Sequence, residues 1–140
     1  MFKKILLAVD GSPHALRAAR VAGDLVRSMK SQKLRIVVAF DPIPAYLGQP
    51  NFENVIQARL KEAERILQQA QKAVGKVPAE IHTELIEGSI AEAIINVATT
   101  RKSDVIVMGS RGRGHLTSAL LGSTSQTVVC NAPCPVLLIR

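Results

Sequence analysis

Short apolar runs that alternate with helical patterns are the feature that most constrains what this chain can fold into. The segments between the runs carry apolar residues at helical spacing, with charged residues largely on the opposite side. Runs that are apolar throughout are typical of strands buried on both faces, as in parallel sheets. Five segments of strand length are predicted, over Ile5–Val9, Leu34–Phe40, Glu80–Ile86, Val105–Met108 and Pro135–Ile139. The alternation predicts an α/β fold: a doubly wound, five-stranded parallel sheet with helices on both faces.

The connections between these strands have the residues of helix starts and turns. Ser12 can cap a helix through its hydroxyl, and Pro13 suits the first helical position. A long amphipathic helix is expected over Ile56–Val74, and a shorter helix over Ile90–Thr100. Prolines and a glycine between Ile43 and Asn51 predict an irregular loop, long enough to be a lid or a partner surface. Its role is left open.

A glycine-rich stretch, Met108–Ser125, follows the fourth strand. It contains four glycines, at Gly109, Gly112, Gly114 and Gly122. Glycine adopts positive φ freely and lets a ligand approach the bare backbone. We expect Ser123 to be the N-cap of the next helix. A glycine loop that leads into a capped helix offers unpaired N–H groups and a positive dipole end to an anion. The stretch therefore predicts a phosphate-binding loop, because glycines that only shaped a loop would not explain the three hydroxyls at the helix start.

The first and fourth strands each end on a residue that suits a ligand site. Asp10 follows the first strand, and Gly109 follows the fourth. Ligands of doubly wound sheets bind beyond the carboxyl ends of the strands, where the strand order reverses. We therefore expect Asp10 and the glycine loop to form one site. The alternative for Asp10 is a hydrogen bond to the turn that follows it.

Common phosphate and catalytic motifs are absent. The sequence contains no G-x-x-x-x-G-K-[ST] loop, and Thr117 replaces the third glycine of a G-x-G-x-x-G fingerprint. No Ser/His/Asp or Cys/His set is indicated by spacing. These absences favour binding without efficient turnover.

Composition disfavours nucleic acid and membrane partners. The net charge is +7, but aromatic residues make up only 3% of the chain and the basic residues are spread over several segments. We interpret the charge as a basic surface that attracts nucleotides. No apolar run approaches the roughly 20 residues of a membrane span, and the apolar run after Lys4 is interrupted by Asp10, as expected of a first strand rather than a signal peptide. The 140 residues fit one domain, 1–140.

The cysteines and histidines do not form a zinc motif. Cys130 and Cys134 have no histidine cluster beside them, because His14, His82 and His115 are scattered. We expect two small buried thiols flanking a turn, which a cytoplasmic chain keeps reduced. His82 is expected to be solvent-facing or structural.

Three motifs resemble those of a known family. Gly109, Gly112 and the Gly122-Ser123 pair have the spacing of the G-2x-G-9x-G-[ST] nucleotide loop of the universal stress proteins. The segments Ile5–Ser12 and Asn131–Ile139 resemble the first strand and turn and the last strand of that family. The resemblance covers essentially the whole chain. It implies the strand order 3-2-1-4-5, which makes the first and fourth strands neighbours.

The resemblance also implies a set of nucleotide-binding residues. In family members that bind ATP, the loop holds ribose and phosphates, and the matching residues here are Met108, Gly109, Gly112, Gly122, Ser123, Thr124 and Ser125. Asp10 matches the acidic position near the nucleotide and its metal, Mg²⁺ or Mn²⁺. Ala39 matches the main-chain position of the adenine pocket. Arg111, Arg113 and His115 could reach phosphates but lie outside the predicted set.

These observations predict a cytoplasmic stress-response protein that binds ATP or AMP and acts as a dimeric sensor or regulator. One alternative is a slow ATPase or phosphotransfer enzyme in which Asp10 positions magnesium. Another is a dimerisation module with a vestigial nucleotide loop. An edge strand over Val136–Ile139 would expose unpaired main-chain groups, and the resemblance implies a homodimer through this strand.

Overall fold

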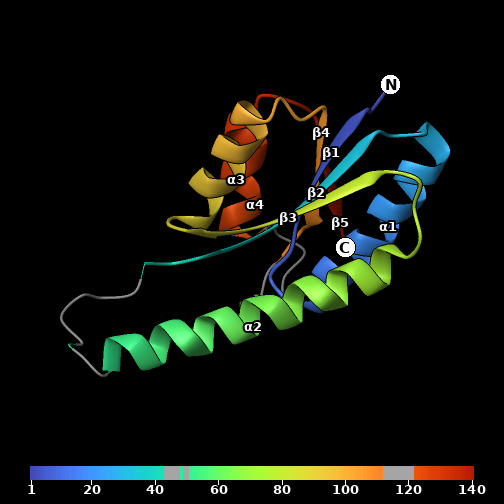
Figure 1. The fold of residues 1–140 in the computed structure, drawn as a ribbon. Helices are drawn as coiled ribbons and strands as arrows, with labels where there is room; N and C mark the ends of the chain where they lie inside the picture. Colours follow the sequence, from blue (N-terminus) through green and yellow to red (C-terminus); the bar gives the residue numbers. More distant parts are fainter. Residues whose placement is uncertain (43–47, 49–50, 112–121) are drawn as a thin grey trace.

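The computed structural model describes residues 1–42, 48, 51–111 and 122–140 (Figure 1). Its strands are β1 (Lys4–Ala8), β2 (Lys33–Phe40), β3 (Glu80–Glu87), β4 (Val105–Gly109) and β5 (Val136–Ile139). Its helices are α1 (Pro13–Met29), α2 (Asn51–Val74), α3 (Ile90–Thr100) and α4 (Ser123–Asn131). Each predicted strand is found within one or two residues of its expected bounds.

The sheet has the predicted topology. All strands are parallel, and their order is β3-β2-β1-β4-β5. β1 lies at the centre, where Ala8 is the register partner of both Val37 on β2 and Met108 on β4. The strand order reverses beside β1, because β2 and β3 extend the sheet on one side and β4 and β5 on the other.

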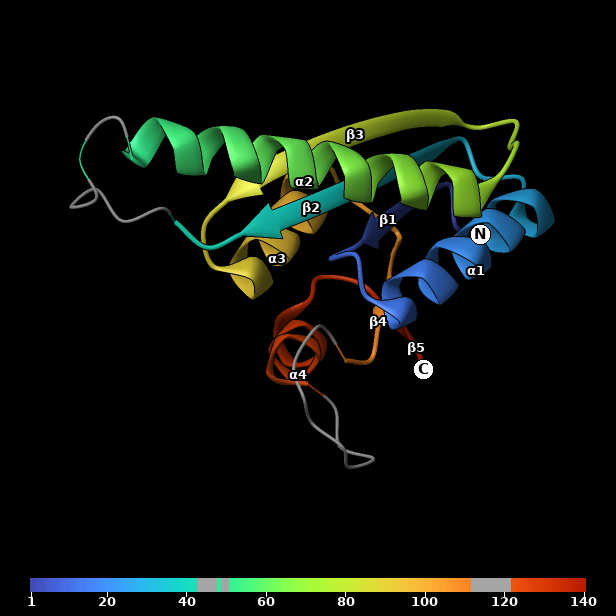
Figure 2. The same cartoon turned by 90° about the horizontal axis from the view of Figure 1, so that it is seen from below.

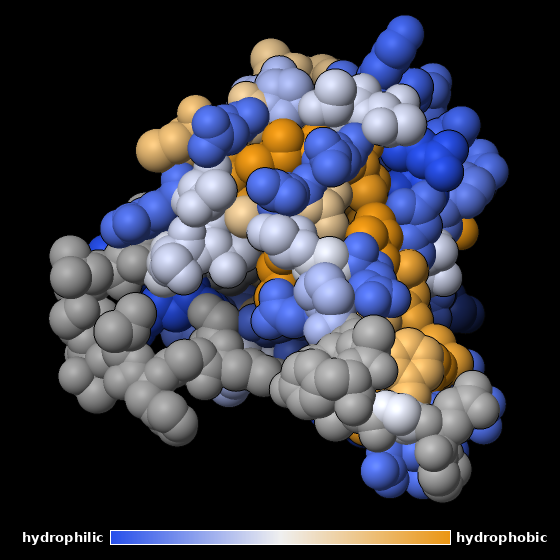
Figure 3. Space-filling view, turned by 90° about the vertical axis from the view of Figure 1, so that its left-hand side faces the viewer, coloured by the Kyte–Doolittle hydropathy of each residue, from blue (hydrophilic) through white to orange (hydrophobic). Residues whose placement is uncertain are grey.

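Two helical layers enclose the sheet. α1 and α2 cover one face, and α3 and α4 cover the other (Figures 1 and 2). On β1, Ile5 and Leu7 pack with the first pair of helices, whereas Leu6 and Ala8 pack with the second pair. This two-sided burial explains why the first run is apolar throughout. Hydrophilic side chains cover much of the face seen in Figure 3, with apolar groups visible between them.

The start of α1 has the predicted chemistry, but the start of α4 does not. Ser12 Oγ accepts a hydrogen bond from Ala15 N at 3.2 Å, and Pro13 is the first helical residue. The prediction of Ser123 as the N-cap of α4 is wrong, because Gly122 occupies that position. Gly122 N donates to Ser110 O at 3.0 Å, and Gly122 O accepts from Gln126 N at 3.0 Å. Since the bond to Ser110 holds Gly122 beside β4, the helix begins one residue earlier than the hydroxyl suggested.

The prediction of two buried thiols is also wrong. Cys130 is exposed, and Cys134 is half-buried. α4 turns Ser125 and Val128 inward, which leaves Cys130 on its outer side. Burial, with a smaller contribution from Asp104, raises the pKa of the Cys134 thiol. Both cysteines are free.

No helix in the described part of the chain is both long enough and apolar enough to cross a bilayer.

Candidate functional site

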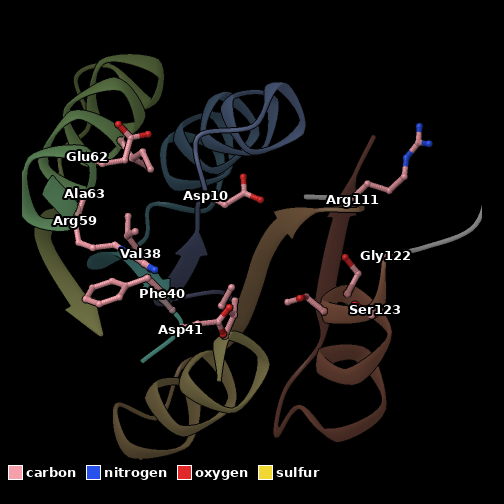
Figure 4. A pocket seen from close by; sticks show the side chains of 15 residues that line it. Asp10, Val38, Phe40, Asp41, Arg59, Glu62, Ala63, Arg111, Gly122 and Ser123 are labelled. Carbon is pink, nitrogen blue, oxygen red and sulfur yellow. The ribbon is translucent and has the colours of Figure 1, made fainter. Parts of the chain in front are cut away.

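A pocket of about 550 Å³ lies where the carboxyl ends of β1 and β2 approach the start of α4 (Figure 4). β1 contributes Asp10 just beyond its end, and β2 contributes residues 38–41. α2 supplies Arg59, Glu62, Ala63 and Ile66, and the α4 side supplies Arg111 and residues 122–125. The volume is within the usual range for small-molecule sites. The position is the topological switch point of the sheet, where ligands of doubly wound folds bind.

The two ends of the glycine stretch lie side by side. Besides the hydrogen bond from Gly122 N to Ser110 O, the Ser125 hydroxyl lies 3.1 Å from Gly109 O and 3.0 Å from Ser110 O. Asp10 lines the same pocket as Gly122 and Ser125. The fold therefore brings the first-strand carboxylate and the helix after the glycine stretch into one site, as the sequence predicted.

Gly109 has a packing role that sequence reasoning did not identify. A Cβ atom at this position would lie 2.7 Å from His14 Cβ and 3.2 Å from Ala15 N. α1 therefore approaches β4 so closely that only glycine fits at the strand end. Gly109 lines a smaller cavity of about 80 Å³, together with Met108. This smaller cavity adjoins the main pocket, since both are lined by Asp10, Ala39 and Ser125.

The three hydroxyl residues at the start of α4 are placed differently. Ser125 is buried, and its hydroxyl holds the two carbonyl groups at the end of β4. Ser123 is exposed and Thr124 is half-buried, and both line the pocket. No side chain caps this helix among the described residues. The amides of its first turn are thus available to an anion in the pocket.

The Asp10 carboxylate accepts a hydrogen bond from the turn that follows it, which is the alternative that the sequence left open. Asp10 Oδ1 accepts a hydrogen bond from Ser12 N at 2.8 Å. Within the described residues, no hydrogen bond to Oδ2 is present, and the side chain faces the pocket (Figure 4). One oxygen therefore stabilises the turn, while the other remains available on the pocket side.

The main chain of Ala39 lies beyond the hydrogen-bond ladder between β1 and β2. Val9 N donates to Val37 O at 3.0 Å, and Gly88 N donates to Phe40 O at 2.9 Å. These bonds fix an alternation in which Val37 and Ala39 direct their main-chain groups toward β1 and Phe40 directs its groups toward β3. β1 ends at Ala8, and among the described residues no main-chain group beyond that end forms a hydrogen bond with Ala39. Its N–H and C=O can therefore pair with the edge of a base.

Sequence reasoning missed the contribution of α2. The Arg59 guanidinium carbon lies 5.3 Å from the centroid of the Phe40 ring, and both residues line the pocket. Glu62 on the same helix lines the pocket too. The pocket-lining residues of α2 follow i, i+3, i+4, i+7 spacing and are Arg59, Glu62, Ala63 and Ile66. Two of them, Ala63 and Ile66, are buried. The helical spacing could therefore have placed Arg59 and Glu62 on the same face as these two apolar residues.

Some predicted residues lie outside the described part of the chain. Gly112, Arg113 and His115 belong to residues 112–121. Arg111 is described and lines the pocket, but its side chain extends away from Asp10 in Figure 4. Among the described residues, no group of three or more His, Cys, Asp or Glu side chains could hold a metal ion.

The fold and the pocket together define a doubly wound α/β protein with a pocket at its switch point. The universal stress protein family profile matches residues 1–140, and the chain belongs to this family. A universal stress protein of Thermus aquaticus is 49% identical over 140 residues, which is the full length of both chains. The UspA universal stress protein of Lactobacillus plantarum has a similar structure, with a TM-score of 0.86, 27% identity and coverage of 99% of this chain and 98% of that chain.

Two structures of more distant sequence contain a ligand. One is the universal stress protein of Archaeoglobus fulgidus in complex with dAMP, with 23% identity, a TM-score of 0.68 and coverage of 100% and 98% of the two chains. The other is an Arabidopsis thaliana family member with AMP bound, with 22% identity, a TM-score of 0.70 and coverage of 98% and 90%. At these identities the likeness shows the shared fold.

Proposed function

We propose that this protein binds an adenine nucleotide, ATP or AMP, in the 550 Å³ pocket and acts as a dimeric sensor or regulator in the cytoplasmic stress response. The observation that carries the proposal is the convergence of three groups on one pocket: the Asp10 carboxylate, the main chain near Ala39 and the first turn of α4. Family members of the same fold hold AMP and dAMP, which supports an adenine nucleotide as the ligand.

Each part of the nucleotide has a matching part of the pocket. The Ala39 main chain offers one donor and one acceptor to the adenine edge, beside the Phe40 ring. The first turn of α4, with Ser123 and Thr124, offers amides and hydroxyls to the phosphates. Met108, Gly109 and Ser125 line the smaller cavity that adjoins this region, and Gly112 matches the family loop motif in the sequence. Asp10 faces the ribose and phosphate region.

The charge of the pocket favours a metal-bound nucleotide. Its lining contains three acids, Asp10, Asp41 and Glu62, and two arginines. Side chains therefore do not neutralise a triphosphate. Mg²⁺ is usually bound through one or two carboxylates together with phosphate oxygens. Asp10 is the residue that would hold Mg²⁺, or Mn²⁺, through a phosphate-bound ion, because the described residues contain no metal site that is complete without the nucleotide.

Thermal unfolding with and without nucleotide tests the binding proposal. Nucleotide at a hundred times its dissociation constant adds ~2.7 kcal/mol of stability, which for a chain of this size raises the melting temperature by about 5–10 °C. Asp10→Asn keeps an oxygen for the Ser12 amide but removes the charge. We expect it to weaken Mg-ATP binding on the order of tenfold, ~1.4 kcal/mol. Asp24→Asn, at an exposed position on α1, is the matched control. No shift with millimolar Mg-ATP, Mg-AMP or AMP would end the proposal.

Slow hydrolysis is the second candidate, because the Asp10 carboxylate lies in the pocket with one oxygen facing the ligand space. Phosphate release should then disappear in Asp10→Asn at ATP concentrations that saturate the variant. Equal release from the variant and the parent protein would identify a contaminating ATPase and leave the protein a binder.

The dimer proposal rests on β5. In the described part of the chain β5 pairs only with β4, so its outer edge leaves main-chain groups unpaired. Leu137 on this strand and Val129 on α4 are exposed apolar residues. Sedimentation should give a dimer for the parent protein. Leu137→Lys should shift the equilibrium to monomer, whereas Leu60→Lys on exposed α2 should not.

A further inference from the structure

A second polar cavity, of about 270 Å³, lies at the opposite end of the sheet, where the strands begin. This is the end that carries the N-terminus in Figure 1. Its charged side chains are all basic, and they are Lys4, Lys33, Arg35, Arg101 and Lys102, with His82 beside them in the lining. The remaining lining residues are Ile5, Thr100 and Ser103. Residues from β1, β2, β3 and the end of α3 therefore meet in one basic cavity.

The strand register places these residues together. Lys4 and Lys33 are direct partners on β1 and β2, and Arg35 is the partner of His82 on β3. Leu34 on β2 packs against α1 and α2, so its neighbours Lys33 and Arg35 point to the other face. On that face α3 ends at Thr100, and Lys33 is exposed while Lys4 and Arg35 are half-buried.

Ordinary structural roles account for part of the cluster. Arg35 and Arg101 both pair with Glu84, at 2.6 and 3.0 Å, and His82 Nε2 lies 2.8 Å from Glu80 Oε1. Arg101 also suits the negative end of the α3 dipole.

These roles do not account for the lysines. Among the described residues, no carboxylate forms an ion pair with Lys4, Lys33 or Lys102. Asp104, beside the cavity, accepts hydrogen bonds at 2.9 Å from the main-chain amides of Lys3 and Lys4. Like charges on directly paired strand residues destabilise a sheet. The register-matched Lys4 and Lys33 therefore repel each other, and an anion bound between them would relieve this repulsion.

We infer that this cavity is a second ligand site, which binds a small oligophosphate of two or three linked phosphate groups. Guanidinium groups bind phosphate oxygens in a bidentate manner, and lysine ammonium groups add compact charge. The Thr100 and Ser103 hydroxyls border the same space. The inference does not depend on the proposed nucleotide pocket, because none of its residues line that pocket.

The lining also indicates that the site does not recognise a nucleobase. Ile5 is its one apolar residue and no Phe, Tyr or Trp side chain lines it, so the cavity lacks the large aromatic platform on which a nucleobase usually stacks. The volume is about half that of the pocket at the other end. Both features favour recognition of the phosphates alone, from a free oligophosphate or from the tail of a nucleoside polyphosphate.

Titration of the full chain with inorganic triphosphate tests the inference. Calorimetry measures affinity, and amide chemical shifts in ¹⁵N-labelled protein locate the site. We expect shifts at Lys4, Lys33 and Arg101, and at least tenfold weaker binding in the double variant Lys4→Gln/Lys33→Gln. The control, Lys72→Gln/Lys76→Gln, removes the same charge at exposed positions and should bind as the parent protein does. Thermal unfolding establishes that both variants are folded.

Titrations with other ligands determine the source of the phosphates and test the competing explanations. If ATP changes these amide chemical shifts no more strongly than triphosphate does, the adenine base makes no contact at this site and the inference stands. The inference is overturned if triphosphate shifts only the start of α4, or if both double variants lose affinity equally. It is also overturned if a single-stranded oligonucleotide, but not triphosphate, binds with dependence on Lys4 and Lys33, because the surface would then be a nucleic-acid site. Failure of AMP to bind anywhere would count against the nucleotide pocket alone.

Discussion

The two ends of the sheet carry opposite charge and are built differently. The pocket at the carboxyl ends is lined by three acids and two arginines, and its first-turn amides and close backbone contacts supply the means to hold a phosphate. The cavity at the amino ends is lined by five lysines and arginines and one histidine. We therefore expect binding at the carboxyl ends of the strands to depend on geometry and on a metal, and binding at their amino ends to depend on charge.

This difference has a direct consequence for salt. Interactions between exposed charges are screened at high ionic strength, but hydrogen bonds from fixed amides are screened much less. Oligophosphate affinity at the amino ends of the strands should fall steeply with salt and should not require Mg²⁺. Nucleotide affinity at the carboxyl ends of the strands should depend on Mg²⁺ more than on salt.

Substitution of Gly109 should have the largest effect on stability. Gly109→Ala places a Cβ atom 2.7 Å from His14 Cβ, and overpacking of this kind costs about 1–3 kcal/mol. We expect a lower denaturation midpoint and weaker AMP binding. Gly122→Ala is the comparison, because Gly122 has φ −65° and alanine adopts that value readily. If Gly109→Ala is as stable as the parent protein, the close approach of α1 to the carboxyl end of β4 does not require glycine.

Removal of the buried hydroxyl of Ser125 should have the next largest effect. Ser125→Ala leaves the carbonyls of Gly109 and Ser110 without this donor, which costs about 1–2 kcal/mol. Ser123→Ala removes an exposed hydroxyl and should change stability by less than ~0.5 kcal/mol. Urea denaturation measures both. Equal costs would contradict the distinction between a supporting and a ligand-facing serine.

Arg59→Ala should reduce AMP affinity about two- to fivefold, the size of a partly exposed cation–π contact of ~0.5–1 kcal/mol. The reason is that Arg59 lies over Phe40 at the wall of the pocket. Lys61→Ala, two residues along α2 and exposed, is the control. Calorimetry with AMP that gave the same affinity for both variants would remove Arg59 from the site.

The smallest effect on stability is expected at the amino ends of the strands, where a substitution should stabilise the protein. Lys33→Gln relieves repulsion from its register partner Lys4 and should stabilise the protein by ~0.2–1 kcal/mol at low salt. The gain should shrink at high salt, because screening weakens the repulsion in the parent protein. Urea denaturation at two salt concentrations measures it, with Lys72→Gln as control. A loss of stability would mean that the two lysines do not repel each other.

Much of the fold could be predicted because local and long-range signals agree in this chain. β1 is apolar throughout since both of its faces are buried, and Ser12 and Pro13 begin α1 where the sequence places them. The strand order was implied by the family resemblance. It places Asp10 and the start of the glycine stretch at the ends of neighbouring strands.

The remaining features depend on contacts that no single segment encodes. Gly122 rather than Ser123 caps α4, because a hydrogen bond to Ser110 sets where the helix begins. Arg59 reaches the pocket only because α2 crosses the end of β2. The basic residues are spread along the sequence, and only the strand register brings Lys4 beside Lys33.

The most direct test of the central claim is an amide chemical-shift titration of the ¹⁵N-labelled protein with Mg-AMP. The account predicts shifts at Ala39 and Phe40 and at the first turn of α4, with little change at Lys4 or Lys33. Shifts confined to the amino ends of the strands, or none at millimolar nucleotide, would contradict an adenine site at the switch point.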